Sequence, residues 1–124
     1  MEPVRVVLVE DNQVFREALE LLLGLRSDVS VVASTPDGED AVDLCLRHKP
    51  DVVLMDYRLP RVDGIEATRA IRSACHAVNI VALTASANPE EMRALEEAGA
   101  VACLTKDQEL DKIVAAIHVA AARA

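Results

Sequence analysis

Short apolar runs alternate with helical patterns along the whole of this chain of 124 residues. Each run is too short for a helix and is typical of a strand buried on both faces of a sheet. Between the runs, apolar residues recur at the spacing of one helix face. Strands that alternate with amphipathic helices favour a parallel sheet with right-handed crossovers. We therefore expect an α/β fold with five helices and with strands at Val4–Val9, Val29–Ala33, Asp51–Met55, Ile80–Leu83 and Val101–Leu104.

Capping residues and helix breakers mark where the helices begin and end. Asn12 can cap the first helix, and Asn88 precedes a proline and two glutamates, the pattern of a capped first turn. Pro50 ends the second helix, and Gly99 ends the fourth. The first helix is expected to face the core with Phe15, Ala18, Leu19, Leu22 and, at its end, Leu25; the last, with Leu110, Ile113, Val114, Ile117 and Ala121.

The length and charge of the chain limit its class. The chain is long enough for one domain, 1–124, with a core of about residues 4–119 and a tail or linker start at 120–124. Thirteen basic and 21 acidic residues give a formal net charge of −8. Such a surface repels phosphate backbones and anionic lipid headgroups, so we expect neither nucleic-acid binding nor membrane binding by this chain alone.

No segment of the sequence predicts export or membrane insertion. No apolar run approaches the ~18 residues that a membrane span requires, and the N-terminus lacks the basic and apolar regions of a secretory signal. Cys45, Cys75 and Cys103 lack the close spacing of a zinc site or a redox pair, which favours reduced thiols. We therefore expect a cytoplasmic protein.

Polar residues follow four of the five predicted strands. Glu10 and Asp11 follow the first strand, Asp56 follows the third and Thr84 the fourth, and Lys106 comes shortly after the fifth. Any one of them could be a solvated strand end or a surface side chain. The carboxyl ends of parallel strands meet at one edge of the sheet, however, and ligands bind there in open α/β folds. We therefore expect these side chains to form one site.

The residue types in this set suit phosphoryl transfer. Three close carboxylates cannot all stay ionised without a cation, and oxygen ligands favour Mg²⁺, with Mn²⁺ as a close substitute. One carboxylate can then act as a nucleophile that becomes an aspartyl phosphate. Thr84 offers a hydroxyl donor and Lys106 an ammonium for the phosphoryl oxygens. The chain has no glycine-rich phosphate loop, so a nucleotide is not an obvious donor.

Glu10-Asp11, Asp56, Thr84 and Lys106, in this order on a five-fold strand–helix pattern, resemble the receiver domain of the bacterial two-component response regulators. The resemblance covers essentially the whole chain. It implies a flavodoxin-like (βα)5 three-layer sandwich with a parallel five-stranded sheet of order 2-1-3-4-5. It also implies that the chain is not an enzyme with substrate turnover and catalyses only its own phosphorylation and dephosphorylation.

The resemblance implies a role for each carboxylate. Asp56 would be the phosphoacceptor. Asp11 and Asp56 would ligate Mg²⁺ through their carboxylates, and Glu10 would act partly through water. The backbone carbonyl of Arg58 would be a further ligand.

The resemblance also implies partners. Thr84 would contact the transferred phosphoryl group, and Lys106 would pair with it. The donor would be a phosphohistidine on a sensor histidine kinase or a histidine phosphotransfer protein, and a phosphorylation-dependent homodimer is compatible with the family. Lys106-Asp107 resembles the subgroup with a C-terminal helix-turn-helix output domain. We therefore expect the switch to control transcription through an output domain that is missing from this chain.

Several positions depart from the family pattern. Cys103 stands where the family often has an aromatic residue, and Asp107 stands where a cis proline commonly follows the lysine. We therefore expect a trans peptide after Lys106 and a signal that travels by movement of loops and helices. Arg58 and Ser86 stand where family members control access of the hydrolytic water. Arg58 could shield the phosphoryl group, pair with an acid or point into solvent.

Two other functions remain open from the sequence. A phosphatase or phosphotransferase with an aspartyl nucleophile usually has a second acid two residues after it, where this chain has Arg58. A constitutive interaction module that keeps the fold without the switch is compatible with Cys103 and Asp107. A response to Mg²⁺ and beryllofluoride separates the switch from the constitutive module, and turnover of a phosphate ester would identify an enzyme.

Overall fold

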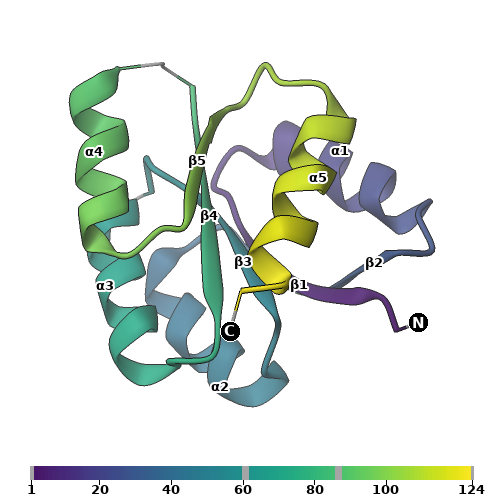
Figure 1. Cartoon of the computed structure of the whole chain (residues 1–124), viewed down its shortest axis with the longest axis horizontal. Helices are drawn as coiled ribbons and strands as arrows, with labels where there is room; N and C mark the ends of the chain where they lie inside the picture. The colour runs from purple at the N-terminus through teal and green to yellow at the C-terminus, as the bar shows by residue number, and fades with distance from the viewer. Residues whose placement is uncertain (1, 60–61, 86–87, 124) are drawn as a thin grey trace.

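A parallel sheet forms the centre of the molecule (Figure 1). The computed structural model describes residues 2–59, 62–85 and 88–123. Within this part of the chain the sheet has five strands in the order β2-β1-β3-β4-β5, which confirms the predicted fold class and strand order. The strands are β1 (Val4–Val9), β2 (Val29–Thr35), β3 (Val52–Asp56), β4 (Asn79–Thr84) and β5 (Ala102–Thr105).

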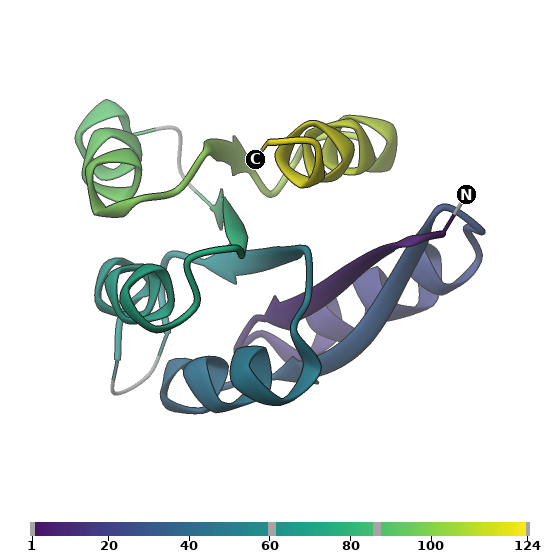
Figure 2. The same ribbon diagram turned by 60° about the horizontal axis from the view of Figure 1, so that its bottom comes forward.

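Helices cover both faces of the sheet, giving three layers (Figure 2). The helices of the described residues are α1 (Gln13–Gly24), α2 (Ala41–His48), α3 (Gly64–Ala74), α4 (Pro89–Ala98) and α5 (Leu110–Ala121), with a short 3-10 helix at Gly38–Asp40. α1 and α5 pack on one face, and α2, α3 and α4 pack on the other. None of these helices is long and apolar enough to cross a membrane.

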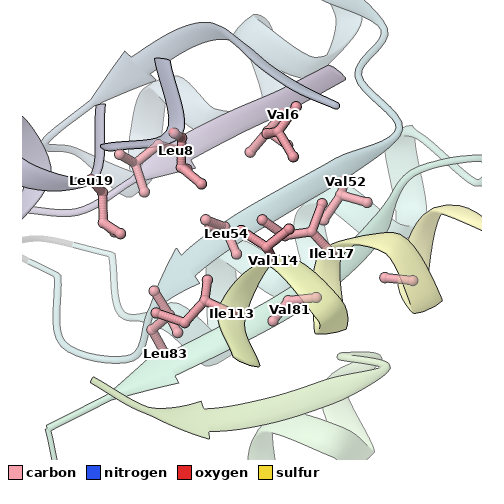
Figure 3. Packing of buried hydrophobic residues seen from close by; sticks show 13 residues of the cluster. Val6, Leu8, Leu19, Val52, Leu54, Val81, Leu83, Ile113, Val114 and Ile117 are labelled. Carbon is pink, nitrogen blue, oxygen red and sulfur yellow. The ribbon is translucent and has the colours of Figure 1, made fainter. Parts of the chain in front are cut away.

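The inner strands β1, β3 and β4 are buried on both faces for most of their length, as their continuous apolar runs predict, whereas the edge strands β2 and β5 are mostly half-buried. In β1, Val6 and Leu8 belong to the core under α1 and α5, whereas Val7 and Val9 belong to the core on the opposite face. This division follows from the two-residue period of a strand. On the first face, Ile113 and other branched side chains of α5 pack against strand residues (Figure 3). Burial of each such side chain contributes roughly 1.5–3 kcal/mol.

Side-chain caps define the predicted helix starts. Asn12 Oδ1 accepts the backbone N–H of Phe15 at 3.0 Å, and Asn88 Oδ1 accepts that of Glu90 at 2.9 Å. Each bond satisfies an N–H that has no partner inside the helix, and a cap of this kind contributes about 1 kcal/mol. The predicted starts of α1 and α4 are therefore confirmed.

The predicted core face of α1 is partly wrong. Leu19 is in the core as expected, but Leu23 is also fully buried, whereas Leu22 is 42% exposed and Leu25 is 78% exposed. Ala18 is exposed as well. Leucines occupy consecutive positions of α1, so sequence periodicity could not decide which of them face the sheet.

The predicted tail at 120–124 begins too early. α5 runs to Ala121, and Ala120 is 1% exposed in the core. Asn79, at the start of β4, donates from Nδ2 to the carbonyl oxygens of Ala120 at 2.9 Å and Arg123 at 3.2 Å. The carbonyls at a helix C-terminus lack partners within the helix. Asn79 supplies a donor for them and fixes the end of α5 beside the sheet.

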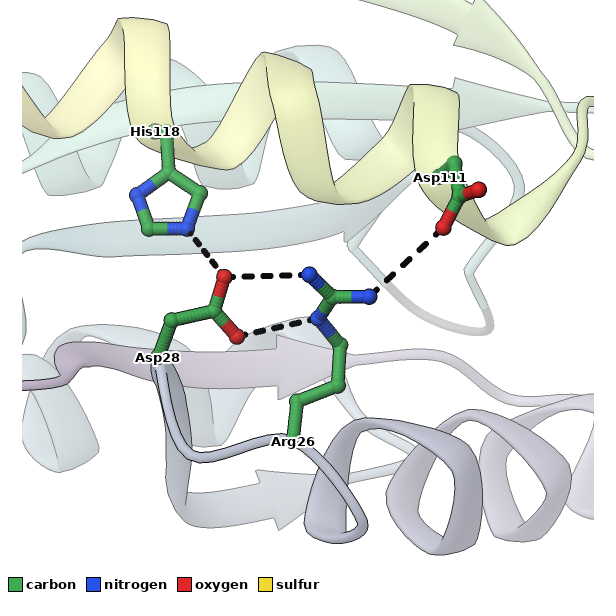
Figure 4. Close-up of polar contacts among 4 residues, drawn as sticks. All are labelled: Arg26, Asp28, Asp111 and His118. Carbon is green, nitrogen blue, oxygen red and sulfur yellow. Dashed lines mark hydrogen bonds and ion pairs between the residues drawn. The ribbon is translucent and has the colours of Figure 1, made fainter.

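A polar network joins α5 to the connection between α1 and β2 (Figure 4). Arg26 donates to both carboxylate oxygens of Asp28, at 2.9 and 3.1 Å, and lies 3.5 Å from Asp111. His118 Nε2 lies 2.8 Å from Asp28 Oδ2. The hydrogen bonds from Arg26 and then from His118 hold the pKa of Asp28 well below its usual value. The network therefore links α5 to a connection that is distant in sequence.

Candidate functional site

Three carboxylates meet where β1 and β3 end. The two strands are parallel neighbours, and Val9 pairs with Met55, so the residues that follow lie side by side. Glu10 and Asp56 are buried, whereas Asp11 is exposed. One carboxylate oxygen from each of the three lies within 4.8 Å of the others. The structure thus brings together the three acids that the sequence singled out.

Lys106 lies between the two buried carboxylates. Its Nζ is 2.7 Å from Glu10 Oε1 and 3.2 Å from Asp56 Oδ1. Its backbone N–H donates to the carbonyl oxygen of Thr84 at 2.7 Å, which fixes the residue after the end of β5. The ammonium also lies 5.0 Å from the ring centroid of Phe15, a cation–π contact. The sequence pattern predicts only a core position for Phe15 and gives no sign of this contact.

Thr84 ends β4 and is buried. The neighbouring strand places Asp56 opposite Leu83, the residue before Thr84. Thr84 in turn pairs with Thr105, the residue before Lys106. The register therefore places Thr84 between the strand ends that carry Asp56 and Lys106.

The negative charge of the carboxylates in the site exceeds the positive charge of Lys106. Burial, followed by the hydrogen bond and negative charge of Glu10, raises the pKa of Asp56 to about 7, although Lys106 opposes this. Burial lowers the pKa of Lys106, but the hydrogen bond to Glu10 and the charges of both carboxylates outweigh burial and raise it. One ammonium thus does not fully compensate the acids, and a further cation would.

The donor set fits a hard divalent cation. All three side chains offer carboxylate oxygens, which Mg²⁺ prefers, and the exposed Asp11 leaves one side of the cluster open to water. The crowding of Glu10 against Asp56 gives a physical reason for a cation here, because it already raises the pKa of Asp56. The residues present therefore suit Mg²⁺.

The loop after Asp56 is held close to the strand end. The N–H of Gly64 donates to the carbonyl oxygen of Tyr57 at 2.8 Å. A Cβ at position 64 would lie 2.6 Å from the carbonyl oxygen of Asp56 and 2.8 Å from Cα of Tyr57. Only glycine allows this approach of α3 to the backbone that carries Asp56.

Arg58 pairs with an acid, which is one of the three alternatives that the sequence left open. Its backbone N–H donates to Asp56 Oδ1 at 3.3 Å, and its guanidinium lies 3.6 Å from the carboxylate of Glu91 in α4. The sequence pattern predicts Glu91 at the start of α4, and no sequence signal connects it to Arg58. The peptide after Lys106 is trans, as expected. Ser86, also expected beside the site, lies outside the described residues.

Cys103 has acids from α4 near it. It is half-buried in β5, and burial, then the charges of Glu96 and Glu91, raise its pKa to about 11. Its thiol is therefore protonated at neutral pH and, in this state, a poor nucleophile.

Comparison with known proteins agrees with this geometry. The family model for the response regulator receiver domain matches residues 6–118. The transcriptional regulatory protein DegU of Brevibacillus brevis is 33% identical over 118 residues, which cover 95% of this chain and 50% of that protein. The chain spans about half the length of the curated transcriptional regulators that it matches.

Solved structures give the same result. The signal receiver domain of NarL from Mycobacterium tuberculosis has a TM-score of 0.92 and 35% identity, and the match covers 99% of this chain and all of that one. A LuxR-family two-component response regulator from Aurantimonas sp. SI85-9A1 has a TM-score of 0.90 and 35% identity, covering 97% of this chain and 86% of that one. The chain therefore belongs to the response regulator receiver domain family, and transcriptional regulators are among the proteins whose receiver domains it resembles.

Proposed function

We propose that this receiver domain is switched by phosphorylation of Asp56. The observation that carries the proposal is the convergence of Glu10, Asp11 and Asp56 with Lys106 at the ends of adjacent strands. Glu10, Asp11 and Asp56 would hold Mg²⁺, with the backbone carbonyl of Arg58 as a further ligand. Mg²⁺ bound there would neutralise the charge of the carboxylates and of the incoming phosphoryl group.

The residues around Asp56 suit an in-line transfer from phosphohistidine. A carboxylate oxygen of Asp56 forms a bond to phosphorus while the bond from phosphorus to the imidazole nitrogen breaks. The electron pair of that bond stays on the nitrogen, and the imidazole takes up a proton. Lys106 already touches Asp56 Oδ1, so its ammonium can follow the charge onto a phosphoryl oxygen. The Thr84 hydroxyl, on the neighbouring strand end, would donate to another.

An exposed apolar surface next to the site supports a protein donor. Its residues recur on one face of α1 and at the end of that helix, and α1 begins two residues after Asp11. The surface consists of Val14, Ala18, Leu21, Leu22 and Leu25. A phosphohistidine on a sensor kinase or phosphotransfer protein can reach Asp56 only if its helix packs beside the site, and an apolar strip there suits such packing.

The output of the switch is proposed from the relatives. DegU is named a transcriptional regulatory protein, and this chain spans half of its length. We propose that the present chain is part of the same type of regulator and controls transcription through an output domain. Any phosphorylation-dependent homodimer would form through contacts between two receiver domains.

Binding of beryllofluoride tests the switch directly, because it mimics a phosphoryl group on aspartate. In an amide NMR titration with Mg²⁺, the wild-type chain should show saturable shifts for residues at the ends of β1, β3, β4 and β5. Asp56→Asn should show none of the shifts that depend on beryllofluoride. An unchanged wild-type spectrum would contradict the proposal and favour a constitutive interaction module.

A further inference from the structure

The side chain of Arg58 connects the loop after Asp56 to the first turn of α4. Arg58 Nη2 lies 3.6 Å from Glu91 Oε1. The two side chains differ in environment, because that of Arg58 is 76% exposed and that of Glu91 is only 16% exposed. An exposed, flexible guanidinium can change partners at little cost, whereas a carboxylate that is mostly buried cannot easily find another cation.

Arg58 is fixed next to the proposed phosphoacceptor by its backbone. Its N–H donates to Asp56 Oδ1 at 3.3 Å, so the base of the side chain stays close to whatever Asp56 carries. A phosphoryl group there would present about two negative charges and three acceptor oxygens. Arginine binds such a group with two parallel hydrogen bonds, a stronger contact than its 3.6 Å approach to one oxygen of Glu91.

Glu91 depends on the charge of Arg58. Among the described residues its Oε2 is buried without a hydrogen-bond partner. The neighbouring Cys103 offers no compensation, because the negative charge of Glu91 helps to raise the pKa of that thiol. Loss of Arg58 would leave a buried carboxylate without its cation, which is costly. The first turn of α4 would then shift toward arrangements in which Glu91 reaches water.

We propose that phosphorylation of Asp56 transfers Arg58 from Glu91 to the phosphoryl group and thereby loosens the first turn of α4. This inference rests on the proposed phosphorylation of Asp56. It assigns the output of the site to a charge exchange between the loop after β3 and the first turn of α4, with Arg58 as the side chain that changes partner.

Hydrogen exchange of the first turn of α4 tests the inference. The wild-type chain is treated with Mg²⁺ and phosphoramidate, and the phosphorylated fraction of the same sample is measured by intact-mass spectrometry. We expect exchange at Glu91 and Met92 to rise about 5-fold or more in the phosphorylated fraction. In Arg58→Ala, exchange should already be high before treatment and should rise less than 2-fold after it. In Glu91→Gln, which keeps the shape without the charge, exchange should stay low in both states.

A matched control is Arg47→Ala, because Arg47 forms an exposed ion pair with Asp43 within α2. This variant should behave as the wild type. A wild-type chain that gains about 80 Da without a change in α4 exchange would overturn the inference but leave the proposed function intact. An increase upon phosphorylation in Arg58→Ala equal to that of the wild type would also overturn it. No mass gain would contradict the proposed function itself.

Discussion

At the scale of single residues, the burial of Asp56 makes the site costly without a cation. Its pKa is raised from 3.8 to about 7, so the folded chain holds a proton that the unfolded chain releases. The contribution of this proton to the free energy of unfolding is fully present below about pH 4 and is lost as the pH rises through about 7. Asp56→Asn removes this loss. It should therefore stabilise the metal-free chain at pH 8 by on the order of 1–3 kcal/mol, with a much smaller effect at pH 4.

Urea unfolding at the two pH values, with a chelator present, measures this difference. Added Mg²⁺ should stabilise the wild type at pH 8 more than it stabilises Asp56→Asn. An equal effect of the substitution at both pH values would show that the buried carboxylate is not the cause.

The proximity of the acids and Lys106 could be predicted from the sequence, but the pairing of Arg58 could not. Glu10, Asp56 and Lys106 follow apolar strand runs, and the geometry of a parallel sheet brings such positions together. The pairing of Arg58 with Glu91 was not predictable, because it depends on the packing of α4 against a loop that is distant in sequence.

At the scale of elements, the start of α3 is fixed by one close backbone approach. Gly64→Ala would force a methyl group to within 3 Å of the backbone of Asp56 and Tyr57. Displacement of the backbone should cost about 1–3 kcal/mol of unfolding free energy and weaken Mg²⁺ binding. Gly24→Ala, at the end of α1 where nothing lies within 4 Å of the added Cβ, is the matched control. It should be neutral or stabilise by up to about 1 kcal/mol.

Thermal unfolding and Mg²⁺ titration of the two variants, side by side, check this expectation. A Gly64→Ala chain with wild-type stability and Mg²⁺ affinity would mean that the start of α3 does not position the loop after Asp56.

The element boundaries followed closely from local signals, and the face of α1 did not. Asn12 and Asn88 mark helix starts because their side chains bond the first free N–H groups. In α1 both the buried Leu23 and the exposed Leu22 are leucines, so only the position of the sheet distinguishes them. The strand order came from the family resemblance, because local patterns give strands without their neighbours.

At the scale of the whole molecule, the exposed apolar surface on α1 should bind the donor protein. It should not affect the reaction at Asp56 itself. Val14, in the first turn of α1, is 79% exposed. Val14→Asn should slow transfer from any sensor kinase that phosphorylates the wild type by about 10-fold, the loss of roughly 1.4 kcal/mol of apolar contact. Phosphorylation by phosphoramidate should not change.

Val119→Asn is the control, because Val119 is similarly exposed but lies near the end of α5. Phosphotransfer is followed with the radiolabelled kinase. Equal slowing of transfer by both substitutions would show that the exposed apolar surface on α1 does not bind the donor. Slower phosphorylation of Val14→Asn by phosphoramidate would show the same.

The most direct test of the central claim is the mass of the intact chain after treatment with phosphoramidate and Mg²⁺. We expect a gain of about 80 Da, located at Asp56 by peptide mapping after borohydride trapping of the acyl phosphate, and no gain in Asp56→Asn or in the presence of a chelator. A wild-type chain that stays at its original mass, or that carries the phosphoryl group on another residue, would contradict the assignment of Asp56 as phosphoacceptor.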